Sequence, residues 1–501
     1  MSQELSLREI RLQKLAQLRE LGLDPYKVEK WERTDSAQGL LDGFEEGKAV
    51  SFAGRLSSYR LMGKAGFAHL SDGDAKIQSY FRKDDLTESE WEAYKLLDIG
   101  DHVGVEGELF VTKTGEKSIH VRRFVPLSKA LHNMSFGKEK DGETFSGLSD
   151  IEIRYRHRHL DLVANPEARK ALIDRARIVS AVRRYFDGLG YLEVETPMLQ
   201  LEAGGAAARP FLTHYNAYEA DVKLRISLEL YLKRLICGDI PAVYEIGRVF
   251  RNEGVSNRHS PEFTMLEFYE AYGNLETMME RTEGVFRDVA QSVLGTTELH
   301  GIDFGKPWHR VDLLDAIGGH TGLSREELGN LDLALEASNR LDVPAKAIAA
   351  GGYIDLAKET NLGGLIEKLL EVFVEPTLQE PSFVVGYPIE ISPLAKKDPG
   401  NPRMTRRFEG YVLGREVCNA FSEINDPIDQ RERFEQQLGE RAKGDDEAHP
   451  MDEDFLYALE SGMPPTGGCG IGMDRMAMLL TGQNAIREVL FFPFMRPDRE
   501  E

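Results

Sequence analysis

The sequence predicts an α+β protein in which a small β-barrel precedes a larger domain of helices and strands. The chain has 501 residues, which is too long for one hydrophobic core, so about two or three domains are expected. Short segments of alternating apolar and polar residues occupy 50–127, whereas helical periodicity begins after residue 150. We therefore expect a helical extension over 1–49, a barrel over 50–130, a linker over 131–150 and the larger domain over 151–501.

The composition is that of a globular protein with a surplus of acidic residues. Hydrophobic residues make up 41% and charged residues 29%, and the formal net charge is −22. Taken alone, this charge argues against a nucleic-acid partner, because phosphate contacts need local positive charge. Net charge is a weak guide in a long chain, however, and basic residues cluster in 151–160 and 175–184 while acidic residues collect in 444–455. Such clusters are most often solvated faces.

The cysteines and the N-terminus bear on cellular location. Cys237, Cys418 and Cys469 are far apart and have no metal-ligand spacing. An odd, sparse count argues against a disulfide framework and fits a reducing cytoplasm. The N-terminal residues are charged throughout, unlike a signal peptide, and no run of roughly 18 apolar residues exists to span a membrane. We expect a cytoplasmic protein without membrane contact.

The N-terminal part begins with a helix and continues as short strands. Residues 5–21 have helical character, are basic at Arg8, Arg11, Lys14 and Arg19, and end at Gly22, a typical C-cap residue. The basic residues are expected to form a solvated face. Beyond residue 50, three alternating segments, a helix with a capping box at Thr87 and Glu90, and two more alternating segments follow.

Three strands, a helix and two strands match a five-stranded closed barrel of the OB type, a fold that often binds oligonucleotides. Phe67 and Phe81 could stack on bases there, although each ring, taken without context, is more often a core residue. The polar stretch "FGKEKDGETFSG" then indicates a linker. The larger domain is expected to open with a helix whose first turn holds Pro166 and which Gly190 ends.

The stretch "GRVFRNEGVSNRHSPEFTMLEFYEAY", residues 247–272, predicts a β-hairpin with a charged loop. Alternation places Phe263, Met265, Glu267 and Tyr269 on one face of its second strand. An aromatic ring, a thioether, a carboxylate and a phenol on one face suit a ligand pocket better than a core. Pairing of the strands would bring Arg251 beside Glu267, and a structural salt bridge is an equally good interpretation of that pair in isolation.

A second set of polar residues lies in "RRFEGYVLGREVCNAFSEINDP", residues 406–427. Glu409 and Glu416 are seven apart on what we interpret as one extended segment, and strict alternation puts them on opposite faces. A shared metal site would need a bend or bulge, which Gly410 and Gly414 allow. Asn419, Phe421 and Glu423 share a face that Glu416 joins only if a second irregularity lies near Cys418.

The third stretch, "TGGCGIGMDRMAML", residues 466–479, predicts a glycine run that opens a helix carrying Arg475 in its first turns. Glycines allow a ligand close to the backbone, and a helix N-terminus favours anions. The spacing does not match the dinucleotide-binding fingerprint, so a Rossmann unit is not expected.

Together with "GYLEVETPML", these stretches resemble the three ordered motifs of class II aminoacyl-tRNA synthetases. "GGAAARPF", "SLELYLKRL", "SPLAK" and "SGMPPTGGCGIGMDR" resemble the lysyl-tRNA synthetases of bacterial type within that class. The resemblance covers nearly the whole chain. It implies about six antiparallel strands flanked by helices, an anticodon-binding barrel, and a homodimer formed through the first motif.

The resemblance also implies the role of each matched position. ATP would be bound by Arg251, Glu253, His259, Phe263, Glu409, Glu416 and Arg475, with Arg251 and Arg475 as the catalytic cations. Glu409 and Glu416 would hold Mg²⁺. Lysine would be bound by Gly205, Glu229, Arg251, Glu267, Tyr269, Asn419, Phe421 and Glu423, and the anticodon of tRNA(Lys) by Phe67, Gln78 and Glu116. Departures from the common family pattern occur at Ser260, Cys418, Ala420 and Cys469.

The chemistry of the implied reaction agrees with these residue types. The lysine carboxylate attacks the α-phosphorus of ATP, so positive charge is needed where two anions meet, and no nucleophilic side chain is required. A ribose hydroxyl at the 3′ end of tRNA then takes the lysine. Glu229 and Glu267 at one end of the substrate and Glu423 at the other would partner its two ammonium groups, and a neutral amino acid would leave Glu423 buried and unpaired.

Two alternatives stay open at this stage. An enzyme that attaches lysine or a related amino acid to a protein would not need the barrel expected over 50–127. A catalytically dead paralogue with a nucleic-acid-binding or regulatory role would be expected to lose motif arginines or metal carboxylates, and Arg251, Arg475, Glu409 and Glu416 are all present.

Overall fold

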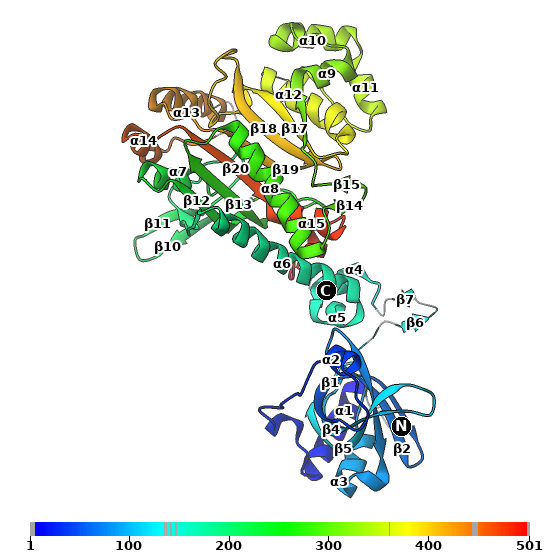
Figure 1. Cartoon of the computed structure of the whole chain (residues 1–501). Helices are drawn as coiled ribbons and strands as arrows, with labels where there is room; N and C mark the ends of the chain where they lie inside the picture. Colours follow the sequence, from blue (N-terminus) through cyan, green and yellow to red (C-terminus); the bar gives the residue numbers. More distant parts are fainter. Residues whose placement is uncertain are drawn as a thin grey trace, which may run out of the picture. The chain divides into compact units, whose positions relative to one another are not determined.

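The computed structural model describes residues 6–134, 136, 138–140, 143–145, 148–359, 361–442 and 449–497. It divides into two compact units, residues 1–169 and 170–501 (Figure 1). No helix in these described ranges is long and apolar enough to cross a membrane.

The first unit contains the expected five-stranded barrel. Its strands close in the order β1-β2-β3-β5-β4. The capping box on Thr87 and Glu90 opens helix α3 as predicted. The elements are α1 (Leu7–Glu20), α2 (Ala37–Asp42), β1 (Ala49–Met62), β2 (Ala65–Ser71), β3 (Lys76–Arg82), α3 (Glu88–Lys95), β4 (His102–Val111) and β5 (Lys117–Ser128).

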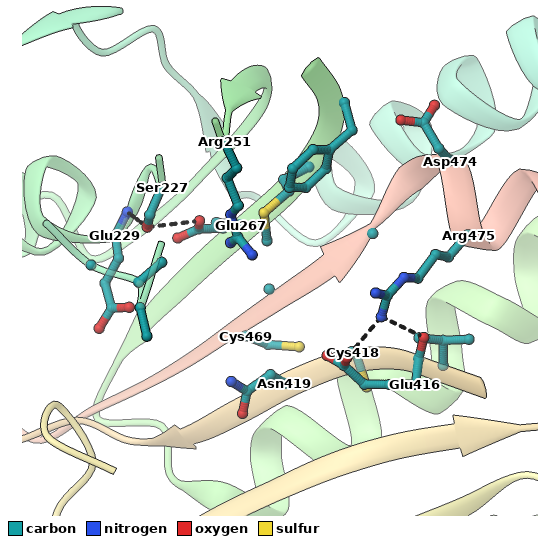
Figure 2. A pocket seen from close by; sticks show the side chains of 18 of the residues that line it. Ser227, Glu229, Arg251, Glu267, Glu416, Cys418, Asn419, Cys469, Asp474 and Arg475 are labelled. Atoms are coloured by element: carbon teal, nitrogen blue, oxygen red, sulfur yellow. Dashed lines mark hydrogen bonds and ion pairs between the residues drawn. The ribbon is translucent and has the colours of Figure 1, made fainter. Parts of the chain in front are cut away.

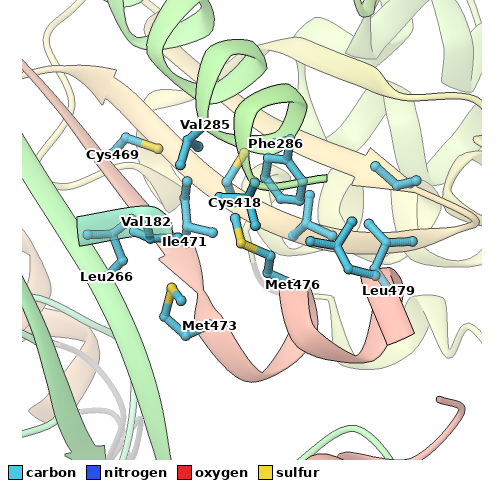
Figure 3. Packing of buried hydrophobic residues seen from close by; sticks show 14 of the residues in the cluster. Val182, Leu266, Val285, Phe286, Cys418, Cys469, Ile471, Met473, Met476 and Leu479 are labelled. Atoms are coloured by element: carbon cyan, nitrogen blue, oxygen red, sulfur yellow. The ribbon is translucent and has the colours of Figure 1, made fainter. Parts of the chain in front are cut away.

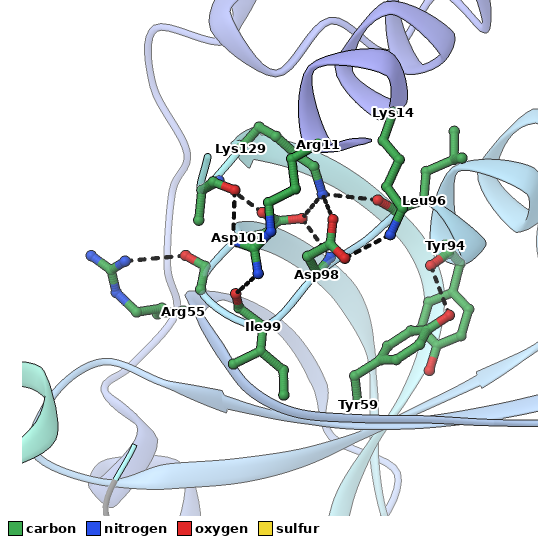
Figure 4. A network of polar contacts seen from close by, with 12 residues as sticks. Arg11, Lys14, Arg55, Tyr59, Tyr94, Leu96, Asp98, Ile99, Asp101 and Lys129 are labelled. Atoms are coloured by element: carbon green, nitrogen blue, oxygen red, sulfur yellow. Dashed lines mark hydrogen bonds and ion pairs between the residues drawn. The ribbon is translucent and has the colours of Figure 1, made fainter. Parts of the chain in front are cut away.

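Two basic residues of helix α1 contact the rest of the first unit, so the prediction that they form part of a solvated face is wrong. Arg11 is buried and donates to the carbonyl oxygens of Ala130 and His132 at 2.8 and 2.5 Å. Lys14 pairs with Asp98 at 2.6 Å (Figure 4). These charges lie inward because backbone carbonyls and a carboxylate are there to receive them.

The rest of the first unit lies between the barrel and the second unit in sequence. Strands β6 (Lys138–Lys140) and β7 (Glu143–Phe145) pair within the expected linker, whose residues 135, 137, 141, 142, 146 and 147 lie outside the described residues. Helices α4 (Ile151–Arg156) and α5 (Arg158–Ala164) follow. Arg158 is fully buried and pairs with Asp161 at 2.6 Å, so this basic cluster is not simply a solvated face.

The second unit is organised around an eight-stranded sheet in the order β16-β17-β18-β19-β20-β13-β12-β8. The six strands from β17 to β12 are antiparallel, as the resemblance implies, whereas the edge strands β16 and β8 pair in parallel. The sheet comprises β8 (Leu192–Glu193), β12 (Ala242–Phe250), β13 (Glu262–Ala271), β16 (His309–Asp312), β17 (Ser382–Pro388), β18 (Met404–Val412), β19 (Arg415–Ser422) and β20 (Thr466–Gly472).

One face of this sheet is covered by three helices and forms the main core. Helix α6 (Pro166–Gly188) begins at the proline expected in its first turn, and α8 (Leu275–Leu294) and α15 (Met473–Thr481) pack with it. Figure 3 shows Phe286 of α8 and Met476 of α15 packed around Ile471 of β20. Leu266 and Phe268 of β13 point into this core, which leaves the alternate residues of β13 for the opposite face.

Other helices surround the opposite face and the sheet edges. Helices α7 (Glu229–Cys237), α13 (Pro427–Ala442) and α14 (Glu453–Glu460) share a second core with β12. A separate core joins α9 (Leu313–Thr321), α10 (Leu331–Arg340), α11 (Val343–Ala349) and α12 (Leu362–Leu369) to β17. The remaining elements are β9 (Leu199–Gln200), β10 (Leu212–Tyr215), β11 (Ala220–Leu224), β14 (Glu298–Leu299), β15 (Ile302–Asp303) and α16 (Ile486–Val489).

Candidate active site

A cavity of about 380 Å³ lies over the open face of the large sheet, and its floor is strand β20. Its lining includes every predicted lysine- and nucleotide-site residue except Glu409. These are Gly205, Glu229, Arg251, Glu253, His259, Phe263, Glu267, Tyr269, Glu416, Asn419, Phe421, Glu423 and Arg475. Residues from motifs that are about 200 positions apart in the sequence therefore meet in one cleft.

Strand register explains why glycines form the floor. Glu267, Gly470 and Asn419 lie in one row across β13, β20 and β19. Tyr269, Gly468 and Phe421 form the next row. The middle strand thus contributes no side chain in either row while both neighbours contribute functional groups, which leaves a trough in which a ligand can approach the backbone.

The glycine run differs in one respect from its sequence-based prediction. Residues 466–472 form strand β20, and the helix α15 begins only at Met473. Asp474 in the first turn of α15 accepts the backbone N–H of Thr264 at 2.8 Å and pairs with Arg175 at 2.6 Å, which ties this turn to β13 and α6. The glycines themselves lie in the strand, where they allow a ligand to approach the backbone closely.

The segment around Glu409 and Glu416 is a hairpin, so our interpretation of it as one extended strand is wrong. Leu413 and Gly414 have φ values of 53° and 64° and form a tight turn between β18 and β19. Tyr411 pairs with Glu416, and Gly410 pairs with Cys418, which leaves Val417 as an extra residue in β19. The predicted irregularity near Cys418 is thus present, and this bulge brings Glu416 to the face that carries Asn419 and Phe421.

One end of the cavity is strongly acidic. Glu267 accepts hydrogen bonds from the Leu228 N–H at 3.0 Å and the Tyr269 hydroxyl at 2.9 Å, and burial followed by the nearby Glu229 raises its pKa to about 7. Burial also raises the pKa values of Glu229 and Glu423. Buried carboxylates gain from a nearby cation, which favours their ionised form.

Two arginines also line the cavity, Arg475 away from Glu229 and Arg251 on the side of Glu267. In Figure 2, Arg475 and Glu229 lie on opposite sides of β20, and the guanidinium of Arg475 points toward Glu416. Arg475 donates to the Glu416 carboxylate at 2.7 Å and carbonyl oxygen at 3.0 Å, and this carboxylate raises the pKa of the guanidinium. Arg251 lies 5.1 Å from the centre of the Phe263 ring, where burial lowers its pKa. The cavity therefore brings guanidinium groups and carboxylates together in one site.

Arg251 does not lie where the hairpin prediction put it. Strand β12 ends at Phe250, and the register partner of Glu267 is Glu245, which pairs with Arg225 at 2.6 Å instead. Arg251 reaches the same cavity from just beyond the strand, so it and Glu267 share a site, although no ion pair joins them in the part of the chain that the structure describes. Arg251 and Glu267 therefore share the cavity, as predicted, but the alternative of a structural salt bridge between them is wrong.

Glu409 is held apart from the cavity lining. Its carboxylate accepts hydrogen bonds from the hydroxyls of Tyr387 and Tyr411 at 2.8 and 2.6 Å and pairs with Arg407 at 2.6 Å. Within the described ranges no group of three or more His, Cys, Asp or Glu residues has the arrangement of a metal site. The carboxylates nevertheless crowd together here, because burial and then Glu409 and Glu416 raise the pKa of Glu375 to about 7.

Two further residues of this site were not found from the sequence. Arg407 lines the cavity and donates to Asn419 Oδ1 at 3.0 Å. Lys233 is fully buried behind the cavity and pairs with both Glu229 and Glu423. Alternation places Arg407 on the same face as Glu409, which is a signal that could have identified it. Nothing in the local pattern of Lys233 distinguishes it from a solvated helix lysine.

On the barrel, the three predicted anticodon residues lie near one another. Gln78 donates to Glu116 at 2.6 Å, and Glu116 also contacts His69 at 2.9 Å. Phe67 is partly exposed and lies 4.9 Å from the Tyr80 ring. Phe81 is fully buried, so its alternative interpretation as a core residue is the correct one. A partly exposed aromatic ring beside amide and carboxylate groups suits the recognition of single-stranded bases.

The fold and the cavity define a class of protein. The large sheet has six antiparallel strands, with Arg251 just after β12, glycines along β20 and Arg475 on α15. Residues 150–496 match the family of class II tRNA synthetases (D, K and N), and this architecture agrees with that match. Residues 50–127 match the OB-fold nucleic acid binding domain. The chain belongs to the class II tRNA synthetase family, which confirms the resemblance and the fold predicted from the sequence.

Similar proteins narrow the class further. The chain is 48% identical over 501 residues to the lysine–tRNA ligase of Syntrophomonas wolfei, which covers 99% of this chain and 98% of that protein. It is 47% identical over 501 residues to the lysine–tRNA ligase of Bacillus subtilis, with 97% of each chain covered. The lysine–tRNA ligase of Enterococcus faecalis is 46% identical over 500 residues, again with 97% of each chain covered.

Proposed function

We propose that this chain is a lysine–tRNA ligase, which activates lysine with ATP to lysyl-adenylate and pyrophosphate and then transfers lysine to the 3′ end of tRNA(Lys). The observation that carries the proposal is the charge arrangement of one cavity. Three buried carboxylates, Glu229, Glu267 and Glu423, and two arginines, Arg251 and Arg475, line this one cavity. An amino acid with two ammonium groups suits the carboxylates and a triphosphate suits the arginines.

Activation is a reaction between two anions, and the arginines address that problem. Arg251 would contact both the lysine carboxylate and the α-phosphate, and Arg475 the γ-phosphate. Phe263, whose ring already lies against Arg251, would stack on the adenine, with Glu253 and His259 at the mouth of the cavity. Because no covalent enzyme intermediate is needed, positioning and charge stabilisation supply the catalysis.

The lysine subsite follows from the acidic end. Glu229 and Glu267, with Gly205, would receive the α-ammonium, and Glu423 with Tyr269 the ε-ammonium. Asn419 and Phe421 would line the side chain between these ends. Burial of either ammonium without a partner would cost several kcal/mol, so the carboxylates select lysine and reject neutral amino acids.

Mg²⁺ fits the donor set of this region. Glu416 borders the cavity and Glu409 lies on the paired strand, and Mg²⁺ commonly uses one or two carboxylates together with substrate phosphates and water. That habit agrees with the lack of a three-ligand cluster among the described residues. The ion would neutralise phosphate charge. The chain's own contribution is to hold Glu409 through Tyr387 and Tyr411 and Glu416 through Arg475.

Transfer to tRNA, assembly and location complete the proposal. Residues 50–130 would read the anticodon through Phe67, Gln78 and Glu116, and 151–501 would form the catalytic domain. A homodimer is supported by exposed apolar side chains in and around the first motif, Leu192, Met198, Leu199 and Leu201. Three free cysteines support a cytoplasmic location.

ATP–pyrophosphate exchange with each amino acid in turn tests the activation step. Exchange with lysine alone is expected, and it should be abolished by EDTA and restored by Mg²⁺. Exchange with no amino acid, while tRNA is still bound in a filter assay, would instead support the catalytically dead, nucleic-acid-binding alternative. Aminoacylation of tRNA(Lys), with transfer to a protein acceptor measured in parallel, separates the ligase from an enzyme that modifies proteins.

A further inference from the structure

Lys233 is a buried cation at the acidic end of the cavity. Its side chain has no exposure to solvent, and its ammonium pairs with the Glu229 carboxylate on the same helix and with the Glu423 carboxylate just after β19. The ammonium also lies 5.3 Å from the centre of the Phe421 ring and 5.7 Å from that of Phe455. Lys233 is not among the residues that line the cavity, so it lies behind the carboxylates.

The formal charges at this end give Lys233 a specific consequence. Glu229, Glu267 and Glu423 contribute three negative charges and Lys233 one positive charge, so these four side chains carry −2 when ionised, with Arg407 as a further cation nearby. The two ammonium groups of free lysine supply +2. Without Lys233 the three buried carboxylates would carry −3, and buried carboxylates in that situation take up protons instead of holding cations.

We propose that Lys233 is a positioning residue for lysine recognition, which keeps Glu229 and Glu423 ionised and fixes the spacing between the two carboxylates that receive the substrate ammonium groups. This inference rests on the proposed function. It adds a residue that the substrate does not touch. Helix α7 and the end of β19 approach each other at this ammonium, so the distance between the two carboxylates depends on it.

The direction of the pH effect follows from the neighbouring groups. Burial raises the pKa values of Glu229 and Glu423, and Lys233 opposes that rise in both. Removal of the ammonium therefore raises both pKa values further, and lysine binding should then require a higher pH. The ionisable groups that face this cluster from the packed elements are Glu267, Tyr269, Arg407, Cys237 and His449. All remain in place in the variants below.

The test measures kcat/KM for lysine in ATP–pyrophosphate exchange as a function of pH. K233Q keeps a hydrogen-bond donor and removes the charge, whereas K233R keeps the charge and alters the spacing. Arg234→Gln is the matched control, because Arg234 is the next residue of α7 and its side chain is partly exposed, 3.9 Å from the exposed Asp454. The KM for ATP and the melting temperature are measured on all variants.

We expect kcat/KM for lysine in K233Q to fall about 100-fold at neutral pH, the order found when one partner of a buried charge pair is truncated. The part of its pH profile in which kcat/KM rises should move to higher pH. The KM for ATP in K233Q and all kinetic constants of the Arg234→Gln control should stay unchanged. A lower melting temperature with an unmoved limb and an unmoved lysine KM would mean that the pair is merely structural and would overturn the inference.

If K233Q melts below the assay temperature, the test is made with K233R. The pH dependence of kcat/KM in K233R should match that of the wild type while its KM for lysine is raised. An unchanged KM for lysine would refute the inference. The wild-type protein separates this inference from the function it rests on. If the wild type catalyses lysine-dependent exchange and the Lys233 variants behave like it, only the inference about Lys233 is wrong. If the wild type shows no lysine-dependent exchange, the proposed function is wrong.

Discussion

Substitution of Gly468 by alanine tests the glycine floor of the cavity directly. A Cβ atom at this position would lie 2.0 Å from Glu423 Oε1 and 2.4 Å from Tyr269 Cε1. Real Cβ atoms do not approach other heavy atoms so closely, so Glu423 and Tyr269 must move. Both side chains are buried, and Glu423 is also tied to Lys233, so neither can turn into solvent.

The displacement sets the expected magnitude. Clearing the added methyl group requires the Glu423 carboxylate to move by about 1 Å, and a misplacement of about 1 Å in a binding site can cost about 100-fold in rate. We expect Gly468→Ala to lower kcat/KM for lysine by about 100-fold while the KM for ATP stays within about threefold, because Arg251 and Arg475 are not displaced. Overpacking should also destabilise the fold by about 1–3 kcal/mol.

The assay is ATP–pyrophosphate exchange at saturating ATP with lysine varied, alongside thermal unfolding. Gly439→Ala is the control, because a Cβ at Gly439 of helix α13 would meet no heavy atom within 4 Å. That variant should keep full activity and gain about 0.5–1 kcal/mol of stability, since alanine favours a helix over glycine. Lysine kinetics in Gly468→Ala within threefold of wild type would refute the steric role of the floor.

Three further predictions test separate parts of the site. Glu423→Gln should abolish lysine activation and spare ATP binding, because an amide cannot replace a buried carboxylate as the partner of an ammonium. Near-normal lysine activation would contradict the role of Glu423. Glu280→Gln, on the exposed side of α8, is the control. Glu267 must be ionised together with Glu229 and Glu423 to receive lysine, and burial raises the pKa of Glu267 to about 7, so kcat/KM for lysine should fall by about tenfold or more per unit below about pH 7; a flat profile between about pH 6 and pH 8 would exclude Glu267 as one of the groups that must be ionised. Glu116→Gln on the barrel should weaken aminoacylation of tRNA(Lys) and leave ATP–pyrophosphate exchange unchanged. An equal loss of activity in both assays would argue against anticodon contact, and so would a loss of aminoacylation in the control, Glu46→Gln at an exposed position.

Local patterns were sufficient for the elements whose residues interact with near neighbours. The capping box of Thr87 and Glu90, the start of α6 at Pro166 and the alternation along β13 all depend on contacts within a few residues. The hairpin at Leu413 was missed because a non-glycine residue with φ of 53° provides its first turn position, and sequence signals for such turns favour glycine or asparagine.

The sequence by itself determined the class of protein and the identity of the charged residues, because ordered motifs carry the residue types that a reaction between two anions requires. Only the tertiary structure decided how those charges are paired. It placed Glu245 instead of Arg251 opposite Glu267, turned Glu416 toward the cavity through the bulge at Val417, and buried Lys233 between two carboxylates. The physical reason is that strand register and burial arise from packing between distant segments, whereas a motif records only which side chains are available.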